Sequence, residues 1–466
     1  MKKRTFKIIA AIDRNRGIGY QNQLPWPRIK EDMQYFKKIT TETSDPNKIN
    51  VMIMGRKTYE SLKKELPSRI NIVISSTYQP GINTFKTLNE ALLAYYEIPE
   101  VENIFVIGGQ QLFTEAIQRL DCETIYLTQI NENYQCDRFF PSIPAWFFKS
   151  PCKQGENVEF EVYQNRADPQ SDEQQYLSLL REIINTGENK DGRNGKTISI
   201  FGPQHVFDLQ QGFPLLTTKR MFFDGIVKEL LFFLRGQTDA NILSAQGVNI
   251  WNGNSSREFL DKRGLVHYQV GDIGPMYGYN FRHFGHSYEG CQSDYTGKGY
   301  DQLFHLLDSL IKDPHSRRHL LTTYNPATVA ESVLAPCHGI SVQFNVRTNG
   351  ELDCKMFQRS VDAALGYPFN IASYALLVHI LCQVTGYKPG KLIMTLGDTH
   401  LYNDHIEKIK KQLDRVPLVK PKLEIKKEFQ GSTIEERIKF IEELTPNDIQ
   451  LSEYYHWPGI KLEIVI

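Results

Sequence analysis

One polar stretch, about a third of the way along the chain, most constrains what these 466 residues can fold into. Residues 164–173, QNRADPQSDE, contain a proline, lack hydrophobic periodicity and have the composition of a short linker. A chain of this length is expected to form about two to four domains. We therefore expect one domain over residues 1–163, a linker over 164–173 and a second domain over 174–466, with no repeat relating the two halves.

The first half alternates short apolar runs with segments of helical character. Hydrophobicity is continuous within each run, which is typical of strands covered on both faces. The expected strands are 7–13, 50–54, 70–75, 103–108, 124–130 and 158–163, and the expected helices are 28–39, 87–96 and 110–118. The pattern predicts an α/β domain with a mostly parallel central sheet.

The second half mixes helical periodicity with a hairpin signal. Apolar residues recur at helical spacing over 173–188 and 223–236, and residues 369–386 are apolar nearly all round, which predicts a core helix. Two strand-like runs within 341–359, joined by the turn sequence Thr-Asn-Gly, have the form of a hairpin. We therefore expect an α+β domain.

Charge and hydropathy exclude several classes of protein. Lys plus Arg, 54, equals Asp plus Glu, 54, so no net charge draws the chain to nucleic acid or to an anionic membrane. The most apolar helical run, 225–234, is too short to span a bilayer, and the apolar run at the N-terminus stops at Asp13, too early for a secretory signal. We expect no transmembrane segment.

The cysteines indicate a reducing compartment. None of the seven forms a CxxC pair or has a histidine partner at zinc-finger spacing, so we expect a cytoplasmic location and no structural metal. Six are expected to be buried small hydrophobic residues: Cys122, Cys136, Cys152, Cys291, Cys354 and Cys382. Cys337 differs, because it lies between Pro336 and His338 and one hairpin away from Arg359. The Arg359 cation is expected to lower the pKa of Cys337 and favour the thiolate.

Asp32 is the first candidate for chemistry. It lies in LPWPRIKEDMQYFKKIT, residues 24–40, where Ile29 and Phe36 share its face of a predicted helix. Burying an acid without a cation costs free energy, so Asp32 either caps or solvates a surface helix or has a function. This stretch alone leaves both interpretations open.

Ordered motifs around Asp32 resemble those of dihydrofolate reductase. They are IAAIDRNRGIGYQNQLPWP at 9–27, MGRKTYESL at 54–62, LPSRINIVIS at 66–75, VIGGQQLF at 106–113, and YLTQI followed by DRFFP. The resemblance covers nearly the whole first half. It implies the reduction of dihydrofolate with NADPH as the cofactor.

The resemblance also implies a role for each matched residue. Asp32 would bind the pterin edge and promote protonation of N5, and Thr128 would complete that hydrogen-bond network. Phe36 would stack beside the pterin, and Arg69 would hold the folate α-carboxylate. Residues 17–19 would form a mobile loop that closes over nicotinamide. The residues implied to bind NADPH are Ala11, Ile18, Gly19, Gly55, Arg56, Lys57, Thr58, Ser75, Ser76, Gly108 and Gly109.

The second half resembles thymidylate synthase over nearly all of 174–466. The matching motifs are ISIFGPQ, FPLLTTKR, KELLFFLRG, GDIGPMYG, DPHSRRH, LAPCHG, FQRSVDAALGYPFNIASYALLVHI and GDTHLYNDH. The resemblance implies methylation of dUMP, with 5,10-methylenetetrahydrofolate as both one-carbon donor and reductant. Cys337 would add to C6 of the uracil and so make C5 nucleophilic.

Other residues of these motifs are implied to bind substrate or to move protons. Asn370 would read the pyrimidine edge, Glu229 would organise proton transfers, and Tyr277 would help remove the C5 proton. The residues implied to contact the pterin, the sugar hydroxyl or the substrate pocket are Trp251, Asp362, His400 and Tyr402. Those implied to hold the phosphate are Arg193, Arg359, Ser360, Arg317 and Arg318. The last two would come from the second subunit of a homodimer.

The chain departs from the two family patterns at a few positions. Phe113 stands where the reductases commonly have Tyr, and the loop that holds Arg193 is one residue shorter than in most synthases. Asn280-Phe281 replaces a common Gln-Trp pair, and Asn252 stands where an acid is common. None of these changes affects the nucleophile.

Together the two resemblances imply a cycle, because thymidylate synthesis releases the dihydrofolate that the first half would reduce. The combination resembles the bifunctional dihydrofolate reductase-thymidylate synthases. Direct transfer of dihydrofolate between the sites is a hypothesis that local Lys and Arg would favour and the neutral net charge does not. Two other classes stay open: an enzyme in one half with the other as a scaffold, and a nucleic-acid-binding regulator. The presence of both Asp32 and Cys337 disfavours the first, and the lack of a basic, aromatic-rich segment disfavours the second.

Overall fold

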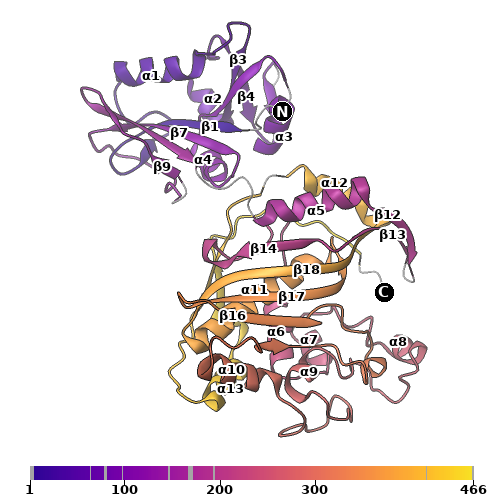
Figure 1. Cartoon of the computed structure of the whole chain (residues 1–466). Helices are drawn as coiled ribbons and strands as arrows, with labels where there is room; N and C mark the ends of the chain where they lie inside the picture. Colours follow the sequence, from indigo (N-terminus) through magenta and orange to yellow (C-terminus); the bar gives the residue numbers. More distant parts are fainter. Residues whose placement is uncertain are drawn as a thin grey trace. The chain divides into compact units, whose positions relative to one another are not determined.

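The chain forms two compact units, each with its own sheet and hydrophobic core (Figure 1). One unit comprises Met1–Ser171 with Arg415–Val419, and the other comprises Asp172–Asp414 with Lys420–Ile466. This computed structural model describes residues 5–62, 64–77, 81–96, 98–144, 147–165, 172–192, 195–415 and 417–463.

The first unit is built on a mostly parallel sheet, which confirms the predicted fold class. The strand order is β10-β11-β7-β1-β6-β3-β4-β5, with β9 paired to β11, and the pairs from β7 through β5 are parallel. The parallel strands are β1 (Phe6–Ile12), β3 (Ile49–Gly55), β4 (Arg69–Ile74), β5 (Asn83–Phe85), β6 (Val101–Val106) and β7 (Cys122–Ile130). The antiparallel edge consists of β9 (Phe147–Lys149), β10 (Lys153–Gln154) and β11 (Val158–Asn165).

Helices cover both faces of this sheet, as continuous apolar strands require. Phe36 of α1 (Lys30–Thr41) and Tyr59 of α2 (Arg56–Leu62) pack against the cluster that contains Met52, Met54 and Phe105. The opposite face packs against α3 (Leu88–Tyr96) and α4 (Gln110–Ile117). The helix predicted from residue 28 begins at Lys30, because Ile29 has an extended backbone.

The second unit is an α+β fold with a largely antiparallel sheet. Its strand order is β12-β13-β18-β17-β16-β15, with β14 paired to β18, and within it β17 and β18 are parallel. The strands are β12 (Glu188–Gly192), β13 (Gly195–Phe201), β14 (Gln204–Asp208), β15 (Leu320–Leu321), β16 (Ser341–Val346), β17 (Glu351–Asp362) and β18 (Lys388–Tyr402). The antiparallel pair of β16 and β17 confirms the predicted hairpin.

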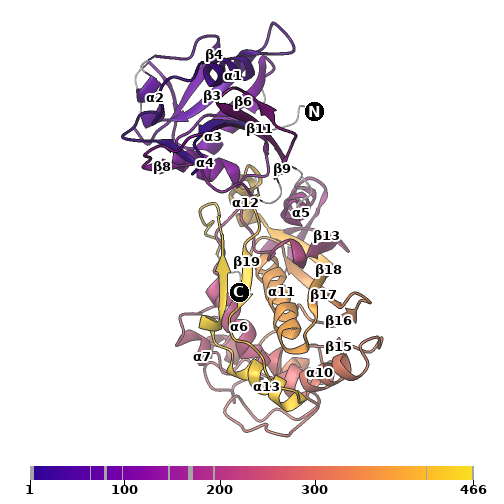
Figure 2. The same cartoon turned by 90° about the vertical axis from the view of Figure 1, so that its left-hand side faces the viewer.

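A long apolar helix, α11 (Gly366–Thr385), forms the centre of this unit. It lies against β17 and β18 with α6 (Phe223–Leu234) beside it (Figure 2). Its length and composition would suffice to cross a membrane, but most of its residues are buried inside the fold, as expected of a core helix. The remaining helices are α5 (Asp172–Thr186), α7 (Asn241–Ser244), α8 (Arg257–Lys262), α9 (Gly278–His283), α10 (Gln302–Lys312), α12 (Ile406–Leu413) and α13 (Ile434–Glu443). A small sheet pairs β19 (Lys422–Ile425) with β20 (Ile449–Ser452), and short 3-10 turns span 209–211, 329–331, 403–405 and 446–448.

Two candidate active sites

The carboxyl ends of the parallel strands gather the predicted cofactor residues of the first unit. Ala11 of β1 is the register partner of Thr128 of β7, and both lie near the ends of their strands. Gly55 ends β3, and its N–H donates to the Gly108 carbonyl just beyond β6, at 2.7 Å. Ligands of parallel α/β sheets bind outside this edge.

Gly108 and Gly109 bring bare backbone to this edge. Gly108 has a φ of +113°, and a Cβ there would lie 2.9 Å from the Phe113 ring, so both conformation and space require glycine. Gly109 precedes the first turn of α4, whose unpaired N–H groups suit an anion. Arg56 and Lys57 are exposed nearby at the start of α2, and Ser75 follows β4.

Asp32 is buried, so its interpretation as a solvated surface residue is wrong. Its side chain is 9% exposed on α1, and burial raises the pKa of its carboxyl group. A hydrogen bond with Thr128, itself buried, acts in the opposite direction. Phe36 lies one turn further along α1 and packs on the core. The structure therefore brings Asp32 and Thr128 together as the sequence predicts.

Arg69 is held in place at the start of β4. Its Nη1 donates to the Thr40 hydroxyl at 2.7 Å, and its Nε donates to the Pro67 carbonyl at 3.0 Å. Burial lowers the pKa of this guanidinium group. These contacts fix the plane of a group whose expected partner is a carboxylate.

Asp13 is a buried acid that the sequence analysis did not single out. Its Oδ1 accepts from the N–H groups of Asn15 and Gly17, at 2.9 and 2.7 Å, and its Oδ2 accepts from Tyr134 N–H at 3.0 Å. The segment expected to be a mobile loop is thereby drawn into a short strand, β2 (Gly17–Gly19), paired with β8 (Arg138–Phe139). An acid placed directly after an apolar strand was the available signal.

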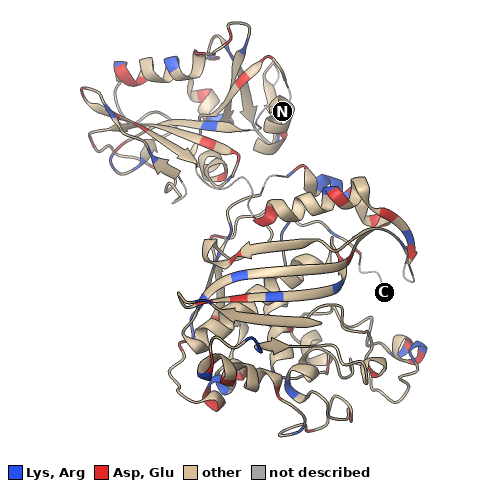
Figure 3. Cartoon of the chain, viewed as in Figure 1, with Lys and Arg blue, Asp and Glu red and all other residues tan. Residues whose placement is uncertain are grey.

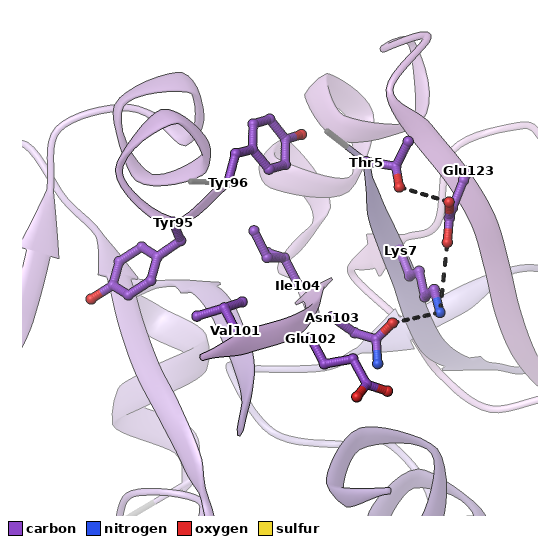
Figure 4. Close-up of a pocket in the computed structure, with 9 residues that line it drawn as sticks. All are labelled: Thr5, Lys7, Tyr95, Tyr96, Val101, Glu102, Asn103, Ile104 and Glu123. Carbon is purple, nitrogen blue, oxygen red and sulfur yellow. Dashed lines mark hydrogen bonds and ion pairs between the residues drawn. The ribbon is translucent and has the colours of Figure 1, made fainter. Parts of the chain in front are cut away.

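A pocket of about 200 Å³ opens at the amino ends of the parallel strands of the same sheet (Figure 4). Its polar lining comes from the beginnings of β1, β6 and β7, away from the strand ends described above. Lys7 donates to Asn103 at 2.8 Å and lies 3.6 Å from Glu123, which also accepts from the Thr5 hydroxyl. Because these groups satisfy one another, the pocket offers little to a ligand.

Cys337 lies half-buried in a polar cluster in the second unit. Its Sγ is 3.4 Å from the Tyr277 hydroxyl, which also accepts from the Cys337 N–H at 3.2 Å. The His338 ring stacks on Tyr277 at 4.3 Å and hydrogen-bonds the Tyr374 hydroxyl at 3.0 Å. The nucleophile predicted from the sequence is therefore next to the predicted proton acceptor.

The prediction that the pKa of Cys337 is lowered is wrong for the chain without ligands. Burial raises the pKa of this thiol by more than the hydrogen bond with Tyr277 and the charge of Arg359 lower it. Arg359 acts in the expected direction, and its guanidinium donates to the Pro336 and Ala335 carbonyls, each at 2.8 Å. The sequence showed the cation but not the extent of burial.

Glu229 and Trp251 complete this cluster. Trp251 Nε1 donates to Glu229 Oε1 at 2.9 Å, and the Trp251 ring lies edge-on to Tyr277. Burial raises the pKa of Glu229 to about 7, against the opposing effect of this hydrogen bond. A carboxyl group that titrates near neutral pH is suited to proton transfer.

The adjacent ends of β17 and β18 carry the other predicted contacts. Asp362 faces His400 in the strand register, and Tyr402 lies edge-on to the His400 ring. Asp362 Oδ1 accepts from the N–H groups of Ala364 and Leu365, which fixes the turn into α11. Asn370 lies half-buried on α11, and Ser360 lies on β17 next to Arg359.

The predicted phosphate arginines are not assembled in one chain. Arg317 and Arg318 are exposed, and among the residues that the structure describes neither side chain forms an ion pair or a hydrogen bond with the Cys337 cluster. Arg193 lies outside the described residues.

Comparison with known proteins assigns each half of the chain to an enzyme family. A family model of dihydrofolate reductase matches residues 5–166, and one of thymidylate synthase matches residues 174–466. The bifunctional dihydrofolate reductase-thymidylate synthase of Paramecium tetraurelia is 42% identical over 440 residues, which cover 91% of this chain and 93% of that protein. Those of Zea mays and Leishmania major are 37% and 38% identical and cover 91% and 99% of this chain, and 91% and 95% of their own lengths.

The chain belongs to the family of bifunctional dihydrofolate reductase-thymidylate synthases. It is therefore an enzyme of thymidylate synthesis and dihydrofolate reduction, with a reductase domain followed by a synthase domain. These domains use folates and NADPH, and the family's substrates are dUMP and folates.

Two departures from the synthase pattern have structural roles in this domain. Asn280 is buried, and its amide donates to the carbonyls of Pro275 and Thr323, both at 2.9 Å. Asn252 accepts from the Ser244 hydroxyl at 2.6 Å. Phe113 of the reductase domain packs on Phe140 with ring centroids 4.9 Å apart.

The prediction that six cysteines are buried is wrong for three of them. Cys122, Cys354 and Cys382 are buried, but Cys136, Cys152 and Cys291 are half-buried because they lie in loops. The ligand atoms of Cys152, Glu159 and Glu161 lie within 4.8 Å of one another. Lys149 Nζ already lies 2.5 Å from Glu161 and 3.5 Å from Glu159, so a cation of the chain itself neutralises this group.

Proposed function

We propose that Asp32 and Cys337 carry the two reactions of the family in this chain. The observation that carries the proposal is that each side chain lies among the partners its reaction needs. Thr128 hydrogen-bonds Asp32, and Tyr277 and Arg359 act directly on the Cys337 thiol. Both reactions are thus assigned to side chains rather than to fold alone.

In the reductase domain, Asp32 binds the pterin edge and promotes protonation of N5. A carboxylate offers two acceptors to the paired N–H donors of the ring, and low dielectric strengthens both bonds. Phe36 stacks beside the pterin, and the Arg69 guanidinium, fixed by Thr40 and Pro67, pairs with the folate α-carboxylate. Thr128 keeps the Asp32 carboxyl group oriented.

The residues at the strand ends fit NADPH. The bare backbone at Gly108 and Gly109 admits a pyrophosphate, and Arg56 and Lys57 supply positive charge for the phosphates. Arg56 and Ser75 favour NADPH over NADH by contacting its 2′-phosphate. NADPH supplies a hydride to dihydrofolate. The other residues that contact NADPH are Ala11, Ile18, Gly19, Gly55, Thr58 and Ser76.

In the synthase domain, Cys337 adds to C6 of dUMP and makes C5 a nucleophile for the methylene carbon of methylenetetrahydrofolate. Asn370 hydrogen-bonds the pyrimidine edge and stabilises the developing enolate. Tyr277, 3.4 Å from Cys337, accepts the C5 proton through a network that Glu229 organises. Asp362 accepts from the pterin, and Trp251 lines the pocket. His400 and Tyr402 bind the sugar hydroxyl.

We propose a homodimer in which Arg317 and Arg318 reach the phosphate of the other subunit's dUMP, beside Arg359, Ser360 and Arg193. Two observations support it: both arginines are exposed, and β16 alternates buried with exposed side chains, as a strand with one open face does. Free cysteines throughout the chain support a cytoplasmic location.

Complementation tests the shared site. Cys337→Ala and the double variant Arg317→Ala/Arg318→Ala should each lack synthase activity. Refolding the two together should restore part of it, because one site of each mixed dimer is intact. No recovery, in a mixture shown to contain mixed dimers, would contradict the donated arginines.

The absorbance of purified protein tests the two reactions in sequence. We expect dihydrofolate to appear after dUMP and methylenetetrahydrofolate are added, and to disappear after NADPH is added. Cys337→Ala should lose only the first step and Asp32→Asn only the second, while Cys382→Ala, a buried cysteine away from the site, should keep both. A wild-type chain with one step only would make the silent domain a scaffold.

A further inference from the structure

Asp398 joins two side chains at the edge of the synthase site. Its Oδ1 lies 3.1 Å from His400 Nδ1, and its Oδ2 accepts from Lys190 Nζ at 2.9 Å. Asp398 and His400 are two residues apart on β18 and therefore share one face of the strand. Lys190 approaches from β12, which reaches β18 through β13 (Figure 1).

The contact with Asp398 fixes which nitrogen of His400 carries the proton. A carboxylate accepts, so Nδ1 is the donor, and Nε2 of the neutral ring is left as an acceptor. Burial raises the pKa of Asp398, but its hydrogen bonds with Lys190 and His400 and the charge of Lys190 outweigh burial and hold that pKa below its usual value. Asp398 is therefore ionised at neutral pH and keeps its role as acceptor.

The pairing of Lys190 with Asp398 has little value for stability. The two side chains are 45% and 38% exposed, and ion pairs in such positions contribute little to folding. The contribution of the pair is to orientation. Lys190 holds the Asp398 carboxylate where its other oxygen meets the His400 imidazole. Lys190 also belongs to the antiparallel pair of β12 and β13.

We propose that Asp398 is a positioning residue that orients His400 to accept a hydrogen bond from the 3′-hydroxyl of dUMP, with Lys190 holding Asp398 in place. The proposal rests on the role of His400 proposed above. A 2′-deoxynucleotide bound through its 5′-phosphate has only this free hydroxyl on the sugar, so the 3′-position is the one group that the imidazole can recognise there.

A nucleotide that lacks the 3′-hydroxyl distinguishes a positioning role of Asp398 from a purely structural one. The affinities of the full-length protein for dUMP and for 2′,3′-dideoxyuridine monophosphate would be measured by calorimetry, with kcat and KM recorded for both. Asp398→Ala should weaken dUMP binding about tenfold or more and leave the affinity for the dideoxy compound equal to that of wild type. Asp398→Asn keeps an oxygen that accepts from Nδ1 and should restore part of the loss.

Two further variants complete the design. Lys190→Gln should weaken dUMP binding less than Asp398→Ala does, and again only for the nucleotide with the hydroxyl. Glu407→Ala breaks another surface ion pair, with Lys410, and should change neither affinity. An affinity for the dideoxy compound equal to that of wild type reports that the synthase domain of each variant has folded.

Equal losses for both nucleotides in Asp398→Ala would overturn the proposal, because they would make Asp398 a general structural support. Unchanged dUMP affinity would overturn it as well. A wild-type chain that binds neither nucleotide would overturn the proposed synthase function itself, and the positioning role with it.

Discussion

Glu229 makes the stability of the synthase domain depend on pH. Burial raises the pKa of its carboxyl group from 4.5 to about 7. The folded protein therefore keeps this proton to higher pH than the unfolded chain does. Because the folded state binds more protons between these two values, the free energy of unfolding falls as pH rises through that window.

Glu229→Gln removes this dependence, because its amide stays neutral. We expect the variant to exceed wild type in free energy of unfolding by about 3 kcal/mol at about pH 8, and by much less at about pH 5. Urea titrations at the two pH values measure the difference. The variant should also lose about 10²-fold or more of its synthase turnover while the reductase reaction continues. Equal stabilisation at both pH values would contradict the raised pKa.

For single residues, the sequence predicted which side chains are candidates for chemistry better than it predicted the burial and contacts of those side chains. Asp32 and Cys337 stood out because an acid in an apolar helix and a cysteine near an arginine are unusual. The direction of the pKa shift at Cys337 could not be predicted from the sequence, because it depends on how strongly burial of the thiol opposes the charge of Arg359. The spacing of Asp398 and His400 was visible in the sequence, but the approach of Lys190 depends on strand order.

Among the elements, β2 depends on the carboxylate of Asp13. Asp13→Ala leaves the N–H groups of Asn15, Gly17 and Tyr134 without their acceptor, so we expect the reductase domain to lose about 2 kcal/mol of stability. Hydrogen exchange at Gly17 should accelerate, and KM for NADPH should rise. Unchanged exchange at Gly17 would show that β2 is held by its pairing with β8 alone.

Helix α5 is attached to the synthase core by its buried apolar face and by one buried acid. Glu173 accepts hydrogen bonds from the N–H and hydroxyl groups of both Thr217 and Thr218. Glu173→Ala should therefore destabilise the synthase domain by about 3 kcal/mol, whereas Glu182→Ala, on the exposed side of the same helix, should change it by less than about 0.5 kcal/mol. Thermal unfolding measures both, and equal effects would contradict the role of Glu173.

Element boundaries followed hydrophobicity where packing agreed with it. The core helix and the hairpin of the synthase domain were predictable because their patterns are long and regular. The strands β2, β9 and β10 were not, because each has only two or three residues and depends on partners distant in the sequence. The helix α1 begins later than predicted for a local reason, the extended backbone at Ile29.

The charged residues of the whole molecule add up to no net charge. Lys and Arg equal Asp and Glu in number, and Figure 3 shows both signs interspersed along both units. If dihydrofolate passes from one site to the other, a net field does not drive it. We expect the lag before tetrahydrofolate forms to stay constant between about 0.05 and about 0.5 M salt, because screening removes only long-range attraction. A lag that lengthens with salt would indicate a local basic track.

The tight contact between Gly17 and Cys136 gives the molecule a second sensitivity to thiol-alkylating reagents. A Cβ at Gly17 would lie 2.2 Å from the Cys136 sulfur, so a group added to that half-buried thiol has no room on the side of Gly17 unless β2 moves. A group added on that side would displace β2 and slow dihydrofolate reduction, although no thiol takes part in that reaction. At Cys337 the same reagent would remove the nucleophile itself. Bound dUMP would protect the synthase reaction and leave the reductase reaction vulnerable.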